Sequence, residues 1–468
     1  MKFIFLNELV VIFKHKMNTL KVLLRSRSNN NLIFRTATTK KKIHDPKEEE
    51  LLPIFQYPVS KSSDRRVYVW GLAETGALGL HMPDKRRAKK SYINDFKLAW
   101  HPMRSSFCER FDVTQIACGY GFTVAAIKTN EQHKVFGTGI NTDSQIGYHA
   151  PRIGHPLEML LSPAPIYVPY KSLENKVIGV AAGRAHTLIL TDNEGVYSLG
   201  NNAYGQCGRK INNAEEYRGS MHSHHISKLG KEKIIDICAG QDHSLFVTES
   251  GKVYSCGWGA DGQTGLGNFD NQGPPAAVKG DITSEKIIKV ASTVDCVLAL
   301  NDKGEIFGWG NSEYGQIPMS SKQQQVNMSY ALVNFTKGLG KIVDIAAGGS
   351  FCLICNDQGD VFVWGFGLLG LGPNVHHTAN PKQIPPTLFG RNEFNSECMV
   401  QKVSSGIGHL AAITNSGDLY TWGRNRHGCL GLGHDKDQHF PLKVSIGAHV
   451  LNVSCSVDHT VAICKPFM

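Results

Sequence analysis

The segment HTLILTDNEGVYSLG (186–200) decides the fold. Two runs of β-branched and apolar residues flank the polar tetrad Asp192-Asn193-Glu194-Gly195, which is typical of a hairpin turn. Similar short polar segments ending in glycine (TESG, NDKG, NDQG and NSG) stand between apolar runs further along the chain. The segment therefore predicts an antiparallel hairpin that is one unit of a repeat.

Two short motifs recur together along the chain. The first has the pattern apolar-aromatic-x-x-Gly, as in VYSLG, and its copies lie 53 to 68 residues apart. It ends at seven repeat glycines: Gly71, Gly139, Gly200, Gly257, Gly310, Gly365 and Gly423. The second motif, as in AGRAHT, follows each copy of the first, at 118–123, 182–187, 239–244, 291–296, 347–352, 405–410 and 455–460. Seven coupled copies at this period predict seven equivalent repeat units.

The residues that recur suit a structural role. A glycine at the end of a strand can take a positive φ or let another backbone approach closely. The tryptophan that precedes four of the repeat glycines suits burial between packed sheets. We expect the histidine of the second motif to hydrogen-bond backbone in a turn of its unit; it is present as His186, His243, His409 and His459.

The ends of the chain complement each other. The first VYVWG (67–71) has no preceding histidine hairpin, and the last one, HTVAIC (459–464), has no following VYxWG. Pairing these two strands would complete one unit and remove the exposed sheet edges of an open array. We therefore expect an all-β protein whose seven units over residues 65–466 form a ring closed by pairing of the N- and C-terminal strands in one unit. The family resemblance given below implies that this ring is a seven-bladed β-propeller, with each unit a blade.

The positive charge is concentrated at the N-terminus. The 468 residues carry a formal net charge of +10, but residues 1–44 hold ten Lys or Arg and one acidic residue, so the remainder is close to neutral. A basic, acid-poor segment with interleaved leucines predicts a mitochondrial transit peptide and basic linker over 1–44, with a second linker at 45–64. The alternatives are a basic tail or an RNA-binding arm. A transit peptide would place the protein in the matrix.

A second basic stretch lies between the first two copies of the repeat. Residues 84–110 hold eight Lys or Arg against three acids, with four interleaved aromatics. Cations beside aromatics suit contact with phosphate and bases. The candidate contacts to RNA or to an acidic partner are Lys85, Arg86, Arg87, Lys89 and Lys90. The alternative is a solvated loop whose aromatics pack against the blade.

Signatures of reaction chemistry are missing from the sequence. No Walker A motif, His-Glu-x-x-His pair or nucleophile elbow is present. The pair Cys352 and Cys355 falls in a predicted strand, where residues three apart point to opposite faces and are poorly placed to share a metal. We expect no cofactor and no metal. A propeller enzyme, with acids or a metal in the central channel, is a third possibility without a distinctive residue set.

The two motifs resemble the regulator of chromosome condensation repeat family, whose members form seven-bladed propellers. With the basic N-terminal segment, the chain is most similar to the mitochondrial, guanine-exchange-factor-like branch of that family. The resemblance implies that residues just before the second-motif histidine promote nucleotide release, with an acid in the third copy and a histidine in the fifth. Asp242 matches this pattern and Ser350 departs from it. The candidate exchange-face residues are Asp242, Asp295 and Asp458, although these carboxylates could equally cap turns.

For this branch the resemblance implies two roles. One is exchange on the dynamin-like GTPase of inner-membrane fusion, which would place the protein in the matrix at the periphery of the inner membrane. The other is purely RNA-linked: assembly of the mitochondrial large ribosomal subunit, in a module that acts on its rRNA. In either role we expect a monomer and no bond-making or bond-breaking activity.

Overall fold

The chain folds into repeated antiparallel sheets. The computed structural model describes residues 65–80, 97–152, 154–318 and 324–467. Within these residues there are seven four-stranded sheets and four short 3-10 helices. The predicted all-β, seven-bladed propeller is confirmed. The predicted transit peptide (1–44) and linker (45–64) lie outside the described residues.

Six of the seven blades are continuous in sequence, each with its innermost strand first. Blade 1 consists of β3(Val113–Gly119), β4(Phe122–Ile127), β5(Val135–Ile140) and β6(Met159–Pro165). Blade 2 consists of β7(Val177–Ala182), β8(His186–Thr191), β9(Gly195–Gly200) and β10(His224–Ile226). Blade 3 consists of β11(Ile234–Ala239), β12(His243–Thr248), β13(Val253–Gly257) and β14(Gln272–Ala277). Blade 4 consists of β15(Ile287–Ala291), β16(Cys296–Asn301), β17(Ile306–Asn311) and β18(Gln325–Ala331). Blade 5 consists of β19(Ile342–Ala347), β20(Phe351–Asn356), β21(Val361–Phe366) and β22(His377–Ile384). Blade 6 consists of β23(Val400–Ser405), β24(His409–Thr414), β25(Leu419–Gly423) and β26(Gln438–Lys443).

Blade 7 combines both ends of the described chain. Its strand order is β2(Leu98–Arg104), β1(Arg66–Leu72), β28(His459–Pro466) and β27(Ala448–Cys455). β1 pairs antiparallel with β28, in a register that sets Gly71 opposite His459. This pairing is the one expected from the two incomplete hairpins of the sequence.

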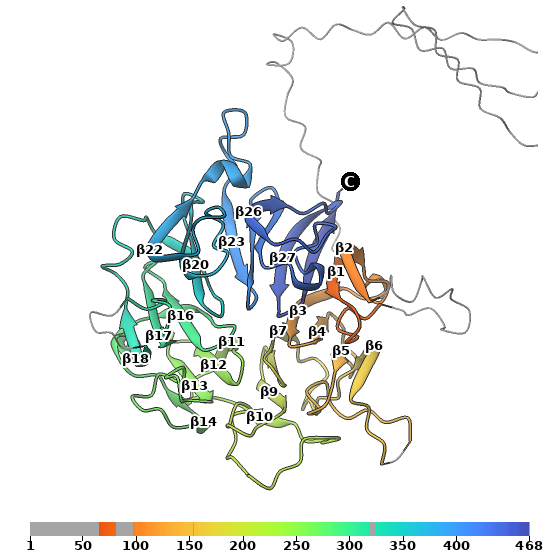
Figure 1. Ribbon diagram of the computed structural model, residues 1–468. Helices are drawn as coiled ribbons and strands as arrows, with labels where there is room; N and C mark the ends of the chain where they lie inside the picture. The colour runs from red at the N-terminus through yellow and green to blue at the C-terminus, as the bar shows by residue number, and fades with distance from the viewer. Residues whose placement is uncertain (1–64, 81–96, 153, 319–323, 468) are drawn as a thin grey trace, which may run out of the picture. The chain divides into compact units, whose positions relative to one another are not determined.

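The blades stand around a central axis. In Figure 1 the innermost strands β3, β7, β11, β23 and β27 gather in the middle, while β6, β14, β18 and β22 lie at the rim. Because all innermost strands have the same place in their blades, the second-motif turns that follow them lie at one end of the ring. We call this end the turn face. The third strands run the same way, so the repeat glycines also lie there.

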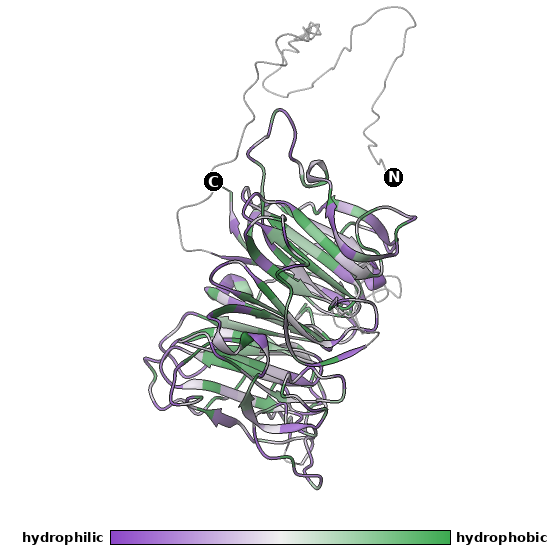
Figure 2. Cartoon of the chain, turned by 90° about the vertical axis from the view of Figure 1, so that its left-hand side faces the viewer, coloured by the Kyte–Doolittle hydropathy of each residue, from purple (hydrophilic) through white to green (hydrophobic). Residues whose placement is uncertain are grey.

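Apolar side chains fill the spaces between blades. Every residue of the second strands β8, β12, β20 and β24 is buried, and Figure 2 shows the hydrophobic colouring concentrated in the strands. Four tryptophans are fully buried: Trp70, Trp309, Trp364 and Trp422. The first three donate from Nε1 to a carbonyl of the preceding blade, at 2.8, 2.9 and 2.8 Å. The predicted burial of these tryptophans between sheets is confirmed.

The helices are short connections. They are the 3-10 helices η1(Cys108–Arg110), η2(Asp281–Ser284), η3(Pro386–Phe389) and η4(Arg426–Gly428). Among the residues that the structure describes, no helix has the length and apolarity needed to span a membrane. The twelve cysteines are free thiols. Cys352 and Cys355 belong to two different core clusters, on opposite faces of β20 as predicted.

Candidate functional site

The repeat glycines hold the turn face together. All seven have φ between +95° and +115°: Gly71, Gly139, Gly200, Gly257, Gly310, Gly365 and Gly423. At Gly257 an added Cβ would lie 2.4 Å from the carbonyl oxygen of Asp242, and the next amide, that of Trp258, donates to the same oxygen at 2.9 Å. Both roles proposed for this glycine, positive φ and close backbone approach, therefore operate together. They fix the turn that carries Asp242.

The second-motif histidines link neighbouring blades. His186, His409 and His459 each place Nε2 2.9–3.0 Å from a hydroxyl of the next blade, on Ser244, Thr460 and Thr123 respectively. The expectation of a backbone partner was wrong for these three side chains. The cause lies in the repeat itself, because the Ser or Thr that follows the histidine position of one blade faces the histidine of the preceding blade.

His243 lacks such a partner, and the pKa values of His243 and His459 shift in opposite directions. Both ring nitrogens of His243 are buried without a hydrogen-bond partner, because the next blade carries Val297 where the partner blades of the other three histidines carry a hydroxyl. Burial lowers the pKa of His243 to about 3. Burial acts in the same direction on His459, but Cys118 and the carboxylate of Asp458, 3.1 Å from Nδ1, outweigh it and raise the pKa of His459.

An ion pair crosses from blade 2 to blade 3 on the turn face. Arg184 Nη2 lies 2.8 Å from Asp242 Oδ2, and Arg184 Nε donates to Asp242 Oδ1 at 3.1 Å. The Asp242 side chain is 10% exposed, whereas that of Arg184 is 45% exposed. Desolvation raises the pKa of Asp242 although Arg184 opposes this shift. The pair thus presents a guanidinium, positioned by a buried carboxylate, to solvent.

A second carboxylate lies close to this pair, in blade 4. Asp295 Oδ1 accepts a hydrogen bond from Gln263 Nε2 at 3.0 Å. Burial, together with the neighbouring charges of Asp261 and Asp242, raises the pKa of Asp295 to about 6. The side chain is only partly buried. Asp295 therefore presents a second, partly exposed carboxylate near the ion pair.

Backbone hydrogen bonds fasten these turns to one another. The amide of Tyr120 donates to Gly183 O at 3.2 Å, that of Arg184 to Gln241 O at 2.9 Å, and that of Gln241 to Val294 O at 3.2 Å. These bonds run from blade 1 through blade 4. The polar groups of the turn face are therefore held on a rigid support.

The predicted exchange-face residues do not form one group. Asp242 and Asp295 are brought together on blades 3 and 4, whereas Asp458 lies in blade 7 and is bonded to His459. Each carboxylate is held by a different side chain, namely Arg184, Gln263 or His459. Ser350, in blade 5, donates to Phe366 O at 2.7 Å.

Aromatic pairs that the sequence analysis overlooked also lie on the turn face. Tyr204 and Trp258 meet edge to face with ring centroids 4.5 Å apart, and Tyr314 stacks on Phe366 at 5.2 Å. Each pair joins two blades, and its members follow the repeat glycines at fixed offsets of four residues and one residue. These fixed offsets from the repeat glycines are the pattern in the sequence from which the pairs could have been predicted. Tyr314 and Phe366 are 36% and 40% exposed, so they enlarge the surface open to a partner.

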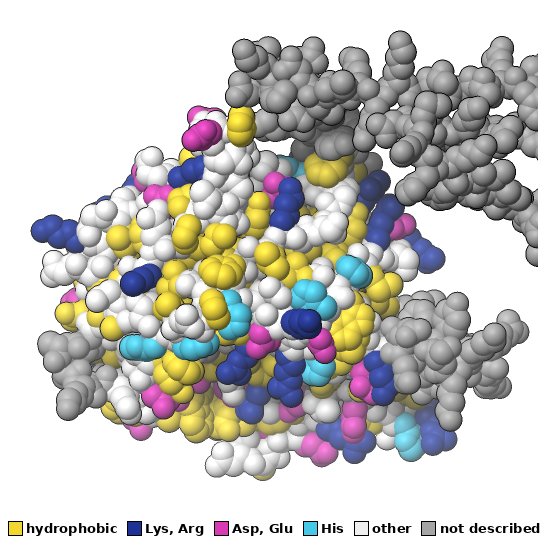
Figure 3. Space-filling model, turned by 45° about the horizontal axis from the view of Figure 1, so that its top comes forward, with side chains coloured by type: hydrophobic (Ala, Val, Ile, Leu, Met, Phe, Trp, Pro, Cys, Tyr) yellow, Lys and Arg dark blue, Asp and Glu magenta, His cyan; other side chains and the backbone are white. Residues whose placement is uncertain are grey.

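The basic insertion is only partly described. Lys85, Arg86, Arg87, Lys89 and Lys90 lie outside the described residues. In the described part, Phe107 packs against Phe111 and Phe136 at 5.0 and 4.9 Å, and Lys97 pairs with Glu74 at 3.2 Å. Phe107 thus packs against the blade, as the solvated-loop alternative expects. Figure 3 shows acidic, basic and histidine side chains intermixed with hydrophobic ones on the face in view. In the described part of the chain, no cluster of three or more metal-ligating side chains is found.

The comparisons with known proteins agree with this architecture. The model of the RCC1-like domain matches residues 165–466, and that of the regulator of chromosome condensation (RCC1) repeat matches residues 64–126. The chain belongs to the RCC1-like family. It is 43% identical over 425 residues to the RCC1-like G exchanging factor-like proteins of Mus musculus and Homo sapiens, covering 89% of this chain and 91% and 90% of theirs.

Solved structures give the same result. The crystal structure of human WBSCR16 is 42% identical, with a TM-score of 0.80, over 86% of this chain and all of that one. Prp20p of Saccharomyces cerevisiae, whose structure is described with its binding to Gsp1p and histones, has a TM-score of 0.68 over 92% of this chain and 97% of that chain. At 21% identity, the second likeness shows the fold alone.

Proposed function

We propose that this protein is a mitochondrial regulator of guanine-nucleotide exchange, which acts by binding a GTPase and makes or breaks no bond itself. Membership of the RCC1-like family and the G exchanging factor-like name of its relatives support this proposal. The observation that carries it is the Arg184–Asp242 ion pair, a half-exposed guanidinium set by a buried carboxylate. Asp242 is also the position at which the family resemblance implies an acid.

Exchange needs only preferential binding. A regulator speeds nucleotide release when it binds the nucleotide-free GTPase more tightly than the loaded one. The turn face offers Arg184, Asp295 and the Tyr204–Trp258 pair on turns that hydrogen bonds already fix. Because these groups are ordered before binding, little conformational entropy is lost on association.

The proposed partner is the dynamin-like GTPase of mitochondrial inner-membrane fusion. The basic, acid-poor segment 1–44 supports import into the matrix, and the protein would act there as a monomer at the membrane periphery. Blade 5 carries Ser350 where the resemblance implies a histidine, so we do not propose the nuclear transport GTPase as its substrate.

A second candidate function is assembly of the mitochondrial large ribosomal subunit without any exchange activity. The observation that favours it is the net charge of +5 on the insertion 84–110. In this role Lys85, Arg86, Arg87, Lys89 and Lys90 would contact rRNA phosphates, and binding would weaken steeply with salt.

Crosslinking followed by purification from mitochondria, with and without RNase, separates the two functions. A photo-crosslinker placed at Tyr204 samples the turn face, and one placed at Lys89 samples the insertion. The exchange proposal predicts a GTPase crosslinked to position 204 in amounts that RNase does not change. Recovery of rRNA or large-subunit precursors from position 89, with no GTPase from position 204, would favour the assembly role and contradict exchange.

A further inference from the structure

Each innermost strand carries a β-bulge, which lies at the second residue in six strands and at Leu451, the fourth residue, in β27. The register of all seven shifts there, as between Ile287 and Lys289 in β15 and between Val400 and Lys402 in β23. A bulge turns side chains away from the regular alternation of a strand. Polar side chains therefore follow the bulge in blades 4 to 7, namely Lys289, Asp344, Lys402 and Asn452.

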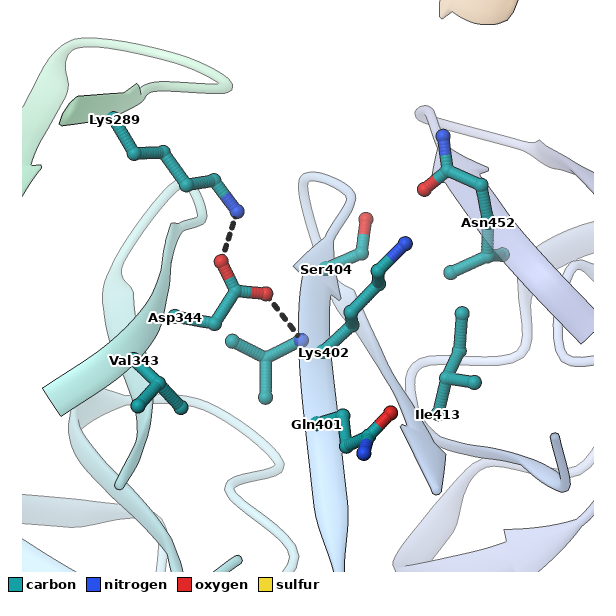
Figure 4. Close-up of a pocket in the computed structure, with 10 residues that line it drawn as sticks. Lys289, Val343, Asp344, Gln401, Lys402, Ser404, Ile413 and Asn452 are labelled. Carbon is teal, nitrogen blue, oxygen red and sulfur yellow. Dashed lines mark hydrogen bonds and ion pairs between the residues drawn. The ribbon is translucent and has the colours of Figure 1, made fainter. Parts of the chain in front are cut away.

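These residues line a pocket of about 360 Å³ between the innermost strands β15, β19, β23 and β27. Val343, Val403, Ile413 and Val453 form apolar parts of its wall. A few polar groups in a partly apolar wall, at this volume, are typical of a site for a small molecule. Figure 4 shows the lining residues.

One side of the pocket carries no net charge. Lys289 forms an ion pair with Asp344 Oδ1, and Asp344 Oδ2 accepts from the amide of Val403 at 2.9 Å. Asp344 is buried, with 6% of its surface exposed. Both oxygens of its carboxylate therefore already have partners within the protein, and its negative charge neutralises Lys289.

The other side carries an uncompensated cation. Lys402 Nζ donates to the carbonyl of Leu451 at 2.8 Å, and an ammonium group has three protons to donate. In Figure 4 the side chains of Lys402, Ser404 and Asn452 lie together, apart from the Lys289–Asp344 pair. With two lysines and one aspartate among its lining residues, the pocket has a formal charge of +1.

We propose that this pocket binds a small oxyanion, a phosphate or carboxylate group carried by a metabolite. Lys402 supplies the opposite charge, and Asn452 and Ser404 supply neutral hydrogen-bond donors. The Lys289–Asp344 pair fixes the opposite wall. The site lies along the innermost strands, and the proposal does not depend on the proposed exchange function.

Isothermal titration of the full chain with inorganic phosphate, adenosine monophosphate and citrate, at constant ionic strength, tests the proposal. We expect saturable binding of at least one anion, and the strongest ligand distinguishes a free phosphate, a nucleotide or a carboxylate source. Lys402→Met should weaken binding about tenfold or more, because it removes a charge-assisted hydrogen bond. Lys402→Arg should retain binding, and Lys382→Met, on the outermost strand β22, should match the unaltered chain.

Asp344→Asn gives a result of opposite sign. It keeps an acceptor for the Val403 amide but raises the pocket charge to +2, so anion binding should tighten. If Lys402→Met does not fold, the anion affinities of Asn452→Leu and Lys402→Arg are compared instead. Asn452→Leu should lose anion binding and Lys402→Arg should keep it. Lack of saturable heat with all three anions, or equal affinity in Lys402→Met and the unaltered chain, would overturn the proposal.

Discussion

A buried imidazole links two blades wherever the next blade supplies a hydroxyl. His186, His409 and His459 have such a partner, and His243 does not because Val297 stands in its place. Where blades 4 and 5 meet, Cys296 and Cys352 occupy these two positions, with their sulfur atoms 3.8 Å apart. The sequence predicted a structural role for the histidines. It did not reveal their partners, because His186 and Ser244 are 58 residues apart and meet only once the ring is formed.

His243→Phe should stabilise the protein. Phe122 and Phe351 already occupy the equivalent position in blades 1 and 5, so the fold accepts the ring there. Removing two unsatisfied buried nitrogens should raise the free energy of unfolding by about 1 kcal/mol at pH 7. Denaturant unfolding followed by fluorescence measures this change.

The stability gained by His243→Phe should increase as the pH is lowered. Burial lowers the folded-state pKa of His243 to about 3, below its ordinary value of 6.5 in the unfolded chain. The unfolded state therefore takes up the extra proton as pH falls from about 6.5 towards 3, and stability is lost over that window. At pH 5 the variant should gain about 2 kcal/mol more. His409→Phe is the matched control, which loses the bond to Thr460 and should gain less. A His243→Phe variant less stable than the unaltered chain at both pH values would refute this account.

The strand β1 closes the ring, and its role could be predicted from the sequence. An incomplete hairpin at each end of the chain was sufficient to predict its pairing with β28. The outermost strands, such as β2 and β10, were not predicted, because they fall in the variable half of each repeat, where no motif recurs. The same holds for the bulges of the innermost strands, which leave no residue signature.

Deleting residues 65–75 should destabilise the protein far more than a typical terminal truncation. The deletion removes fully buried Trp70, whose Nε1 donates to Cys429 O in blade 6 at 2.8 Å, and it exposes the edge of β28. We expect a loss of about 5 kcal/mol or more. The thermal midpoint and the amide exchange of β27 and β28 measure this loss. A chain that lacks residues 1–64 is the control, and an unchanged midpoint in the 65–75 deletion would contradict the closure model.

At the scale of the whole molecule, the blade number followed from the repeat, whereas Asp242 was singled out by the family resemblance. The Arg184–Asp242 pair and the pocket beside Lys402 followed from neither, because each joins residues of different blades that no spacing within one repeat relates. The net charge of +10 is concentrated at residues 1–44, so it says little about the propeller. The proposed functional surface, the turn face, carries charges of both signs.

Release of labelled GDP from the dynamin-like fusion GTPase tests the central claim most directly. The full chain should accelerate release, and Asp242→Asn should reduce that acceleration about tenfold or more, because the guanidinium of Arg184 loses its charged partner. Asp418→Asn is the matched control, because it also breaks an ion pair, here with Lys443 at the end of β26. Asp418 lies in the turn between β24 and β25, at the end of the ring away from the turn face. This variant should act like the unaltered chain. No acceleration at any concentration, or equal activity of Asp242→Asn and the unaltered chain, would contradict the account.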